Sequence, residues 1–119
     1  SKEYFRMIEW MNFVSTEFHK GIGGLAFHKP QGEAKANAEA RVTRMLKIAD
    51  EALGKAEYLN GSFSPADAYF FTVLRWAAMT DLDMAQFANI IKFMERMKAR
   101  PSVKAAMAAE GIAEDKKAA

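Results

Sequence analysis

The segment from Glu57 to Trp76, EYLNGSFSPADAYFFTVLRW, decides the fold of this chain. Its middle carries the signals of a helix N-terminus. Ser64 is placed as the N-cap, Pro65 suits the first helical position, and Asp67 can bond back to the backbone N–H of Ser64. Ser64 and Asp67 therefore form a predicted structural capping box, and we expect a helix to begin directly after Ser64.

The predicted helix is apolar on nearly every side. Over positions 66–79 its only polar residues are Asp67, Thr72 and Arg75. A helix with this pattern runs through a protein core or through a membrane, and this run is too short and too often interrupted by charge for a bilayer. The sequence therefore predicts a buried central helix over about Ser64–Met79, with other helices packed around it.

The composition is that of a globular domain. The chain has 119 residues, of which 50% are apolar and 27% are charged, and this fits one domain with a core. A net charge of +2 is too small to indicate nucleic acid or membrane as a partner. The absence of cysteine excludes disulfides, cysteine-bound metal and a thiolate nucleophile of its own. With no visible signal peptide we expect a cytoplasmic protein, although a processed secreted protein also fits.

Four more helices follow from apolar residues spaced by three and four positions. Gly21–Gly32 breaks this period and is interpreted as a loop, or as a frayed helix followed by a loop. Gly54 and Gly111 are predicted to end helices. We therefore predict an all-α bundle of five to six helices in one domain over residues 1–112, with a frayed tail over 113–119. Besides the central helix, the expected helices are about Lys2–Lys20, Ala34–Leu53, Met84–Ala99 and Ser102–Ala109.

The first predicted helix has two apolar faces. Trp10 and Phe13 lie outside its main apolar seam. Two such faces indicate contact with the core on one side and with a partner or a second domain on the other. The seam itself consists of Tyr4, Met7, Met11, Val14 and Phe18.

Few residues in this chain could carry chemistry. The histidines, His19 and His28, are a poor metal pair because neither belongs to a Glu-x-x-His motif, so no metal site is expected. His19 shares one predicted helix side with Asn12, Thr16 and Lys20, a strip that is either solvated or able to hold a carboxylate. No nucleophile–base pair, carboxylate pair or phosphate loop can be assigned, so the residues by themselves indicate no catalytic centre.

Arg75 allows two interpretations. It belongs to the most apolar helix and precedes Trp76, and a guanidinium in such a place must reach water or a partner. It either extends along the helix to the surface or edges a pocket together with Trp76 and Tyr69.

Three strings together resemble a known family. They are RMIEWMNFVSTEFHKGI at 6–22, EYLNGSFSPADAYFFTVLRW at 57–76 and FMERMKARPSVKAAMAAEG at 93–111. They are similar to the C-terminal helical domain of a bacterial beta-class glutathione S-transferase. The resemblance implies a detoxifying transferase that conjugates the glutathione thiolate to small electrophiles and forms a homodimer. It also implies glutathione as co-substrate, with no other cofactor.

In that family the cysteine and most glutathione contacts belong to an N-terminal thioredoxin-like domain, whose pattern is absent from this sequence. The resemblance thus implies that the chain is the helical portion, which forms the electrophile pocket and much of the dimer interface and is inactive alone. The alternative is a stand-alone, non-catalytic interaction module, since the same fold occurs as an assembly domain in translation-related proteins. The sequence leaves both interpretations open, and with them whether the chain acts as an enzyme.

The resemblance also assigns roles to single residues. Asn12, Glu17, His19 and Lys20 match positions that contact glutathione in the family, and His19 could assist catalysis. Asn12 and Glu17 are expected to act across the dimer interface.

The electrophile pocket has a second set of residues. Trp76 and Ile22 match pocket positions of the family, and the residue pattern adds two more. Where the family commonly has Phe and Pro after His-Lys-Gly, this chain has Ile22 and then two glycines, so we expect a looser pocket and a different substrate range. The predicted pocket consists of Ile22, Tyr69, Arg75 and Trp76.

Overall fold

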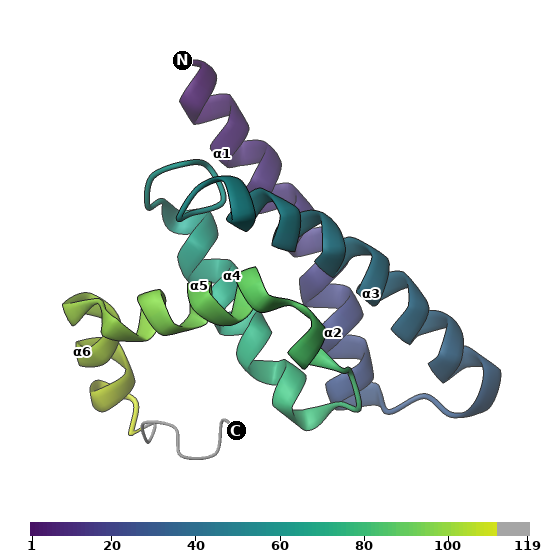
Figure 1. The fold of residues 1–119 in the computed structure, drawn as a ribbon. Helices are drawn as coiled ribbons and strands as arrows, with labels where there is room; N and C mark the ends of the chain where they lie inside the picture. Colours follow the sequence, from purple (N-terminus) through teal and green to yellow (C-terminus); the bar gives the residue numbers. More distant parts are fainter. Residues whose placement is uncertain (112–119) are drawn as a thin grey trace.

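The helix that begins after Ser64 lies at the centre of an all-α structure (Figure 1). The computed structural model describes residues 1–111, and over these its only β-pairing is two isolated bridges within positions 58–62. Helix α4 (Pro65–Arg75) continues into a 3₁₀ turn, η3 (Trp76–Met79). It packs against α1 (Lys2–Phe13), α2 (Lys20–Gly23) and α5 (Ala88–Ala99). The all-α fold and the central helix are therefore confirmed. The helices are α1 (Lys2–Phe13), α2 (Lys20–Gly23), α3 (Gly32–Lys55), α4 (Pro65–Arg75), α5 (Ala88–Ala99) and α6 (Pro101–Ala109).

The N-terminal helix is longer than predicted. The π-helical segment η1 (Val14–His19) joins α1 to α2, and a second one, η2 (Gly24–His28), continues the helix further. Lys29, in the left-handed conformation at φ 47°, ends it. We call residues 2–28 the N-terminal rod. The prediction that the helix ends at Lys20 and that a loop follows directly is therefore wrong. The alternative prediction, in which the helix continues beyond Lys20 before a loop, agrees with the structure.

Two of the three glycines in this rod, Gly21 and Gly23, serve close packing rather than a turn. A Cβ atom at Gly21 would lie 2.6 Å from Cγ2 of Val42 on α3, and one at Gly23 would lie 3.3 Å from the indole of Trp76. Neither glycine has a positive φ. At Gly21 and Gly23 another element approaches the backbone closely. Because glycine adds no apolar side chain to the helical pattern, the pattern breaks at these positions and predicts a loop.

Helix α3 runs antiparallel beside the rod (Figure 1) and is also longer than predicted. Gly54, predicted to end it, lies inside its last turn, where a Cβ atom would be 2.8 Å from the amide nitrogen of Asn89. That prediction is wrong because this glycine makes room for α5. The residues that α3 buries are Val42, Leu46, Ala49 and Leu53.

Helix α5 is capped by a residue of another helix. The 3₁₀ turn η4 (Met84–Gln86) precedes it, so the predicted single helix is interrupted at Phe87. Oδ1 of Asp50 on α3 accepts the backbone N–H of Ile90 at 2.9 Å, and Asp50 also accepts from the side chain of Asn89. The cap therefore ties α3 to the first turn of α5.

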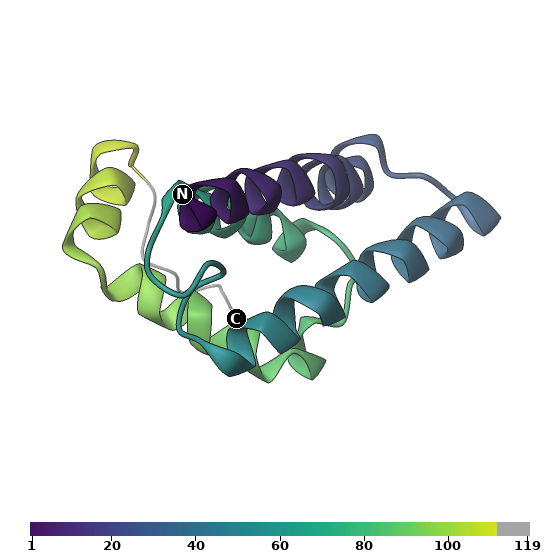
Figure 2. The same cartoon turned by 90° about the horizontal axis from the view of Figure 1, so that it is seen from above.

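The two ends of the described chain lie at the edges of the bundle. Helix α6 packs on α5, away from α2 (Figure 1, Figure 2), and Gly111 follows its end at φ 73°, as predicted. The first turns of α1 extend beyond the neighbouring helices (Figure 1). There Tyr4, Phe5 and Ile8 are 56%, 66% and 36% exposed, so Tyr4 is wrong as a member of the core seam. The predicted tail, 113–119, lies outside the described residues.

Asp67 ties the preceding loop to α4. Its side chain is completely buried. Oδ2 accepts the backbone N–H of Ser64 and Oδ1 accepts that of Leu59, each at 2.9 Å. The predicted capping box is therefore present, and it also holds Leu59, which the motif does not imply. Burial raises the pKa of Asp67, and the bonds from the two N–H groups oppose this shift without cancelling it.

Replacing Asp67 by Ala should lower the free energy of unfolding by about 2–4 kcal/mol, because the buried N–H of Leu59 and the half-buried N–H of Ser64 lose their acceptor at once. The matched control is Asp83→Ala. It removes an exposed carboxylate that accepts the N–H of Ala85 at 3.2 Å and should cost about 0.5–1 kcal/mol. Urea unfolding followed by circular dichroism measures both variants, and equal losses would contradict the role given to Asp67.

The raised pKa of Asp67 should also appear in the pH dependence of stability. The folded state holds this proton more tightly than the unfolded state. The extra stability that protonation of Asp67 gives to the folded state is therefore fully present below the ordinary carboxyl pKa of 3.8 and is lost as the pH rises through the raised pKa, whereas the two hydrogen bonds from Ser64 and Leu59 remain. The unfolding free energy of the wild type, relative to Asp67→Asn, should fall with rising pH in this acid range. Urea unfolding at a series of pH values measures this difference in unfolding free energy. A difference that rises with pH would contradict the raised pKa of Asp67.

Candidate functional site

Four ring side chains from two parts of the chain meet at one place, which we call the aromatic cluster. His19 and Phe27 come from the N-terminal rod, Tyr69 from α4 and Trp76 from η3. Nδ1 of His19 lies 2.7 Å from the hydroxyl oxygen of Tyr69. The ring centroids of His19 and Trp76 are 5.1 Å apart and those of Phe27 and Trp76 are 5.2 Å apart, both edge to face. The four rings are therefore packed as one set.

The spacing of these residues explains why they meet. His19, Gly23 and Phe27 follow one another at intervals of four and lie along one side of the rod. Tyr69 and Trp76 are seven positions apart, which is two turns of the facing helix. Gly23 is buried between the two rod residues, and its missing side chain leaves the space that the indole of Trp76 occupies.

The aromatic cluster is open to solvent on one side. The side chain of Phe27 is 55% exposed and His19 is exposed, whereas Tyr69 and Trp76 are half-buried. Exposed rings beside a hydrogen-bonding imidazole suit a ligand that combines an apolar group with an acceptor.

Two predicted glutathione contacts lie on the surface near the aromatic cluster. Lys20, next to His19 in the chain, is exposed, and within residues 1–111 its ammonium makes no hydrogen bond or ion pair. Asn12 is exposed two turns earlier on the rod, and its carbonyl accepts the hydroxyl of Thr16 at 2.9 Å. The ammonium of Lys20 thus has no partner within residues 1–111, while the hydroxyl of Thr16 is bound within the rod.

Glu17 has a partner inside the chain. Its Oε1 accepts two hydrogen bonds from Arg41 of α3, from Nη2 at 2.9 Å and from Nε at 3.1 Å. The Glu17 side chain is 19% exposed. This ion pair ties η1 to α3, so Glu17 contacts α3 whereas His19 contacts α4.

The structure separates the four predicted pocket residues. Ile22 is completely buried in the core, where it offers no surface to a ligand. Arg75 lines a hollow of about 290 Å³ with residues of α4 and α6, among them Thr72 and Met107. Trp76 instead faces the rod. Arg75 and Trp76 therefore face different elements, because neighbours on a helix point about 100° apart, and the shared electrophile pocket stays a prediction.

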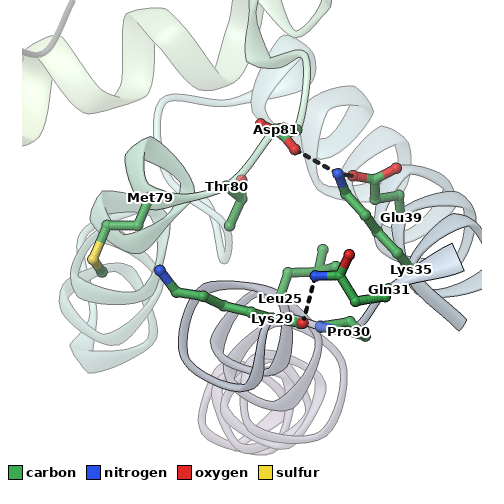
Figure 3. Close-up of a pocket in the computed structure, with 9 residues that line it drawn as sticks. All are labelled: Leu25, Lys29, Pro30, Gln31, Lys35, Glu39, Met79, Thr80 and Asp81. Atoms are coloured by element: carbon green, nitrogen blue, oxygen red, sulfur yellow. Dashed lines mark hydrogen bonds and ion pairs between the residues drawn. The ribbon is translucent and has the colours of Figure 1, made fainter.

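A smaller hollow, of about 230 Å³, lies between the end of the rod, the start of α3 and the segment after η3 (Figure 3). At one side Nζ of Lys35 lies 2.6 Å from Oδ2 of Asp81, and from the other side Lys29 reaches toward Met79. The ion pair raises the pKa of Lys35 and lowers that of Asp81. The hollow contains none of the predicted site residues.

Neither a metal site nor a membrane span is found in the part of the chain that the structure describes. No group of three or more acidic, histidine or cysteine side chains there is arranged to hold a metal ion. None of the helices over residues 1–111 is long and apolar enough to cross a bilayer.

Comparison with known proteins identifies the fold. The sequence model of the family described as Glutathione S-transferase, C-terminal domain, matches residues 7–101, which is most of the chain. The chain belongs to this family.

Relatives of the domain are longer bacterial proteins. Glutathione S-transferase GstA of Escherichia coli O157:H7 is 39% identical over 109 residues, covering 91% of this chain and 54% of the relative. The beta-class glutathione S-transferase structure from Sphingomonas chungbukensis is 36% identical with a TM-score of 0.83, and a sphingomonad glutathione S-transferase complexed with glutathione is 33% identical with a TM-score of 0.84. Each of these two matches covers 95% of this chain and 57% of the chain in the solved structure. The domain thus spans about half the length of these relatives, and the resemblance seen in its sequence is confirmed.

Phe27 is a member of the aromatic cluster that the sequence analysis of this glutathione S-transferase domain misses. The signal was present as the interval of four that runs through His19, Gly23 and Phe27. An interval of four places residues on one face only in a helix. The interval therefore indicates nothing while the segment is interpreted as a loop.

Gly23→Ala should press on the indole of Trp76, because the new Cβ would lie 3.3 Å from Cζ3. Gly24→Ala is the matched control, since its Cβ would meet nothing within 4 Å. Alanine in a helix favours folding over glycine by about 0.5–1 kcal/mol, so Gly24→Ala should gain stability and Gly23→Ala should gain less or lose some. Only Gly23→Ala should shift the indole N–H signal of Trp76 in an NMR spectrum. Equal stabilities with an unmoved indole would contradict the close approach.

Proposed function

We propose that this domain is the helical half of a glutathione transferase, and that it presents His19 and Lys20 to glutathione beside an aromatic wall for the electrophile. One observation carries the proposal: an exposed ammonium and an oriented imidazole lie next to a ring cluster that is open to solvent. Relatives that share this half are glutathione S-transferases, one of them in complex with glutathione, which supports the assignment.

The chemistry of glutathione matches these side chains. The tripeptide carries two carboxylates and two amide carbonyls, which are acceptors, and Lys20 and His19 can both donate. A hydrogen bond from an ammonium to a carboxylate is charge-assisted and about twice as strong as a neutral one. We assign Asn12 and the second carboxylate oxygen of Glu17 to contacts with glutathione in a partner copy.

The reaction that we propose joins the sulfur of glutathione to an electrophilic carbon held against Trp76, Tyr69 and Phe27, and the bond from that carbon to a leaving group such as halide breaks. The thiol must first lose its proton, because the thiolate is the nucleophile. This chain contains no cysteine, so the sulfur comes from the co-substrate. We assign thiol activation to a thioredoxin-like domain, with His19 as an assisting donor, and expect negligible conjugation by the helical domain alone.

We also propose that the domain pairs with a second copy and acts in the cytoplasm, where glutathione is the main thiol. The exposed apolar side chains of Tyr4, Phe5 and Ile8 on the projecting turns of α1 support a protein contact there. Scattered exposed apolar residues are ordinary, but three on adjacent turns of one helix form a patch.

The test uses a chimera in which this domain follows the N-terminal half of the Escherichia coli relative. Lys20→Ala should raise the Kd for glutathione by about tenfold to a hundredfold, the loss of one charge-assisted hydrogen bond. Isothermal titration calorimetry measures the Kd, and a chromogenic aryl halide measures conjugation.

The control is Lys47→Ala, which removes an exposed lysine of α3 without altering the rod or the aromatic cluster. It should leave the Kd within twofold of the parent chimera. A Lys20→Ala chimera that also kept the parent Kd would remove Lys20 from the site. A folded chimera that ignores glutathione would favour the non-catalytic interaction module.

A further inference from the structure

The short contact between His19 and Tyr69 has a direction that decides what His19 can do. Neutral imidazole has one nitrogen that donates and one that accepts. If the Tyr69 hydroxyl donates to Nδ1, the proton of His19 must lie on Nε2. If Nδ1–H donates to the Tyr69 oxygen, Nε2 becomes an acceptor. The two arrangements give the ligand site opposite hydrogen-bonding character.

The geometry favours the hydroxyl as donor. The distance between Nδ1 and the Tyr69 oxygen is 2.7 Å. This is the commonest length for an O–H···O bond, and it lies at the short end of the range of about 2.7–3.2 Å for N–H···O bonds. A phenol is also a better donor than a neutral imidazole, and an imidazole nitrogen is a better acceptor than a phenol oxygen.

The surroundings keep the imidazole in this orientation. The rings of His19 and Trp76 meet edge to face at an interplanar angle of 84°, and those of His19 and Tyr69 at 77°. Within residues 1–111 Nε2 of His19 forms no hydrogen bond, so it is the ring nitrogen left for solvent or ligand. Two neighbouring rings thus hold the plane of the imidazole, and Nε2 has no partner in the described part of the chain.

We propose that Tyr69 is a positioning residue: its hydroxyl donates to Nδ1 of His19 and keeps the proton of the neutral imidazole on Nε2. His19 then presents an N–H to the ligand without having to be charged. Next to the ammonium of Lys20 this makes a surface of donors, which suits a carboxylate or carbonyl oxygen. The identity of that ligand as glutathione rests on the proposed function, whereas the tautomer of His19 depends on this chain alone.

The experiment measures the imidazole nitrogen chemical shifts of the ¹⁵N-labelled domain by NMR. It is made at mildly alkaline pH, where histidines are neutral and tyrosines are protonated. The wild type should show His19 mainly as the Nε2–H tautomer. Tyr69→Phe keeps the ring and removes the hydroxyl, so it should lower the ratio of Nε2–H to Nδ1–H by about threefold to tenfold, the ratio that one ordinary hydrogen bond sustains.

Two controls isolate the effect. Tyr58→Phe removes a hydroxyl that accepts from Arg100 at 3.1 Å and belongs to no residue of the aromatic cluster, so it should leave the tautomer ratio of His19 unchanged. His28 gives an internal reference in every spectrum, and a His28→Gln variant assigns the signals. If Tyr69 had only a structural role, Tyr69→Phe would change the melting temperature but not the tautomer ratio of His19.

Three results would overturn the proposal: a wild type that is mainly Nδ1–H, a ratio that Tyr69→Phe leaves unchanged, or an equal change in Tyr58→Phe. If Tyr69→Phe failed to fold, the wild-type tautomer would still decide. Adding glutathione to the chimera separates the two claims. An Nε2–H tautomer that glutathione does not perturb would count against the proposed function alone, whereas glutathione binding to an Nδ1–H tautomer would count against this inference alone.

Discussion

The carboxylate of Asp67, completely buried, accepts the backbone N–H groups of Ser64 and Leu59, and α4 begins where it does because of these two bonds. The cap also fixes how the preceding loop enters the helix. Since α1, α2 and α5 all pack against α4, a shift of its first turn would displace the whole core. Tyr69 and Trp76 therefore owe their positions to a carboxylate that never contacts them.

The site exists because the N-terminal rod comes unusually close to its neighbours. Gly21 and Gly23 remove the side chains that would hold α3 and the indole of Trp76 away. Each glycine in a helix costs up to about 1 kcal/mol relative to alanine. Tight packing across the rod offsets this cost and brings His19 within hydrogen-bonding distance of Tyr69.

The function that we propose for the domain needs only one half of a site. The aromatic cluster and Lys20 offer hydrogen-bond donors and a ring surface, and the chain contains no cysteine. This division agrees with relatives in which the matched region makes up about half of the protein. Binding and orientation can be supplied by a helical surface, because they require only donors and apolar walls held at a fixed spacing. Activation of a thiol needs a charged or polarised partner at the sulfur. We propose that this partner belongs to a thioredoxin-like domain rather than to the helical surface.

By itself the sequence determined the features that depend on neighbouring residues: the capping box of Ser64 and Asp67, the apolar central helix and the strings that identify the family. Only the tertiary structure decided the features that depend on contacts between distant residues. The glycine-rich segment is helical and packs closely against α3 and Trp76, and α5 is capped by Asp50 from another helix. Arg75 and Trp76, although adjacent in sequence, face different elements. Periodicity reports which residues share a face, but not which element that face will meet.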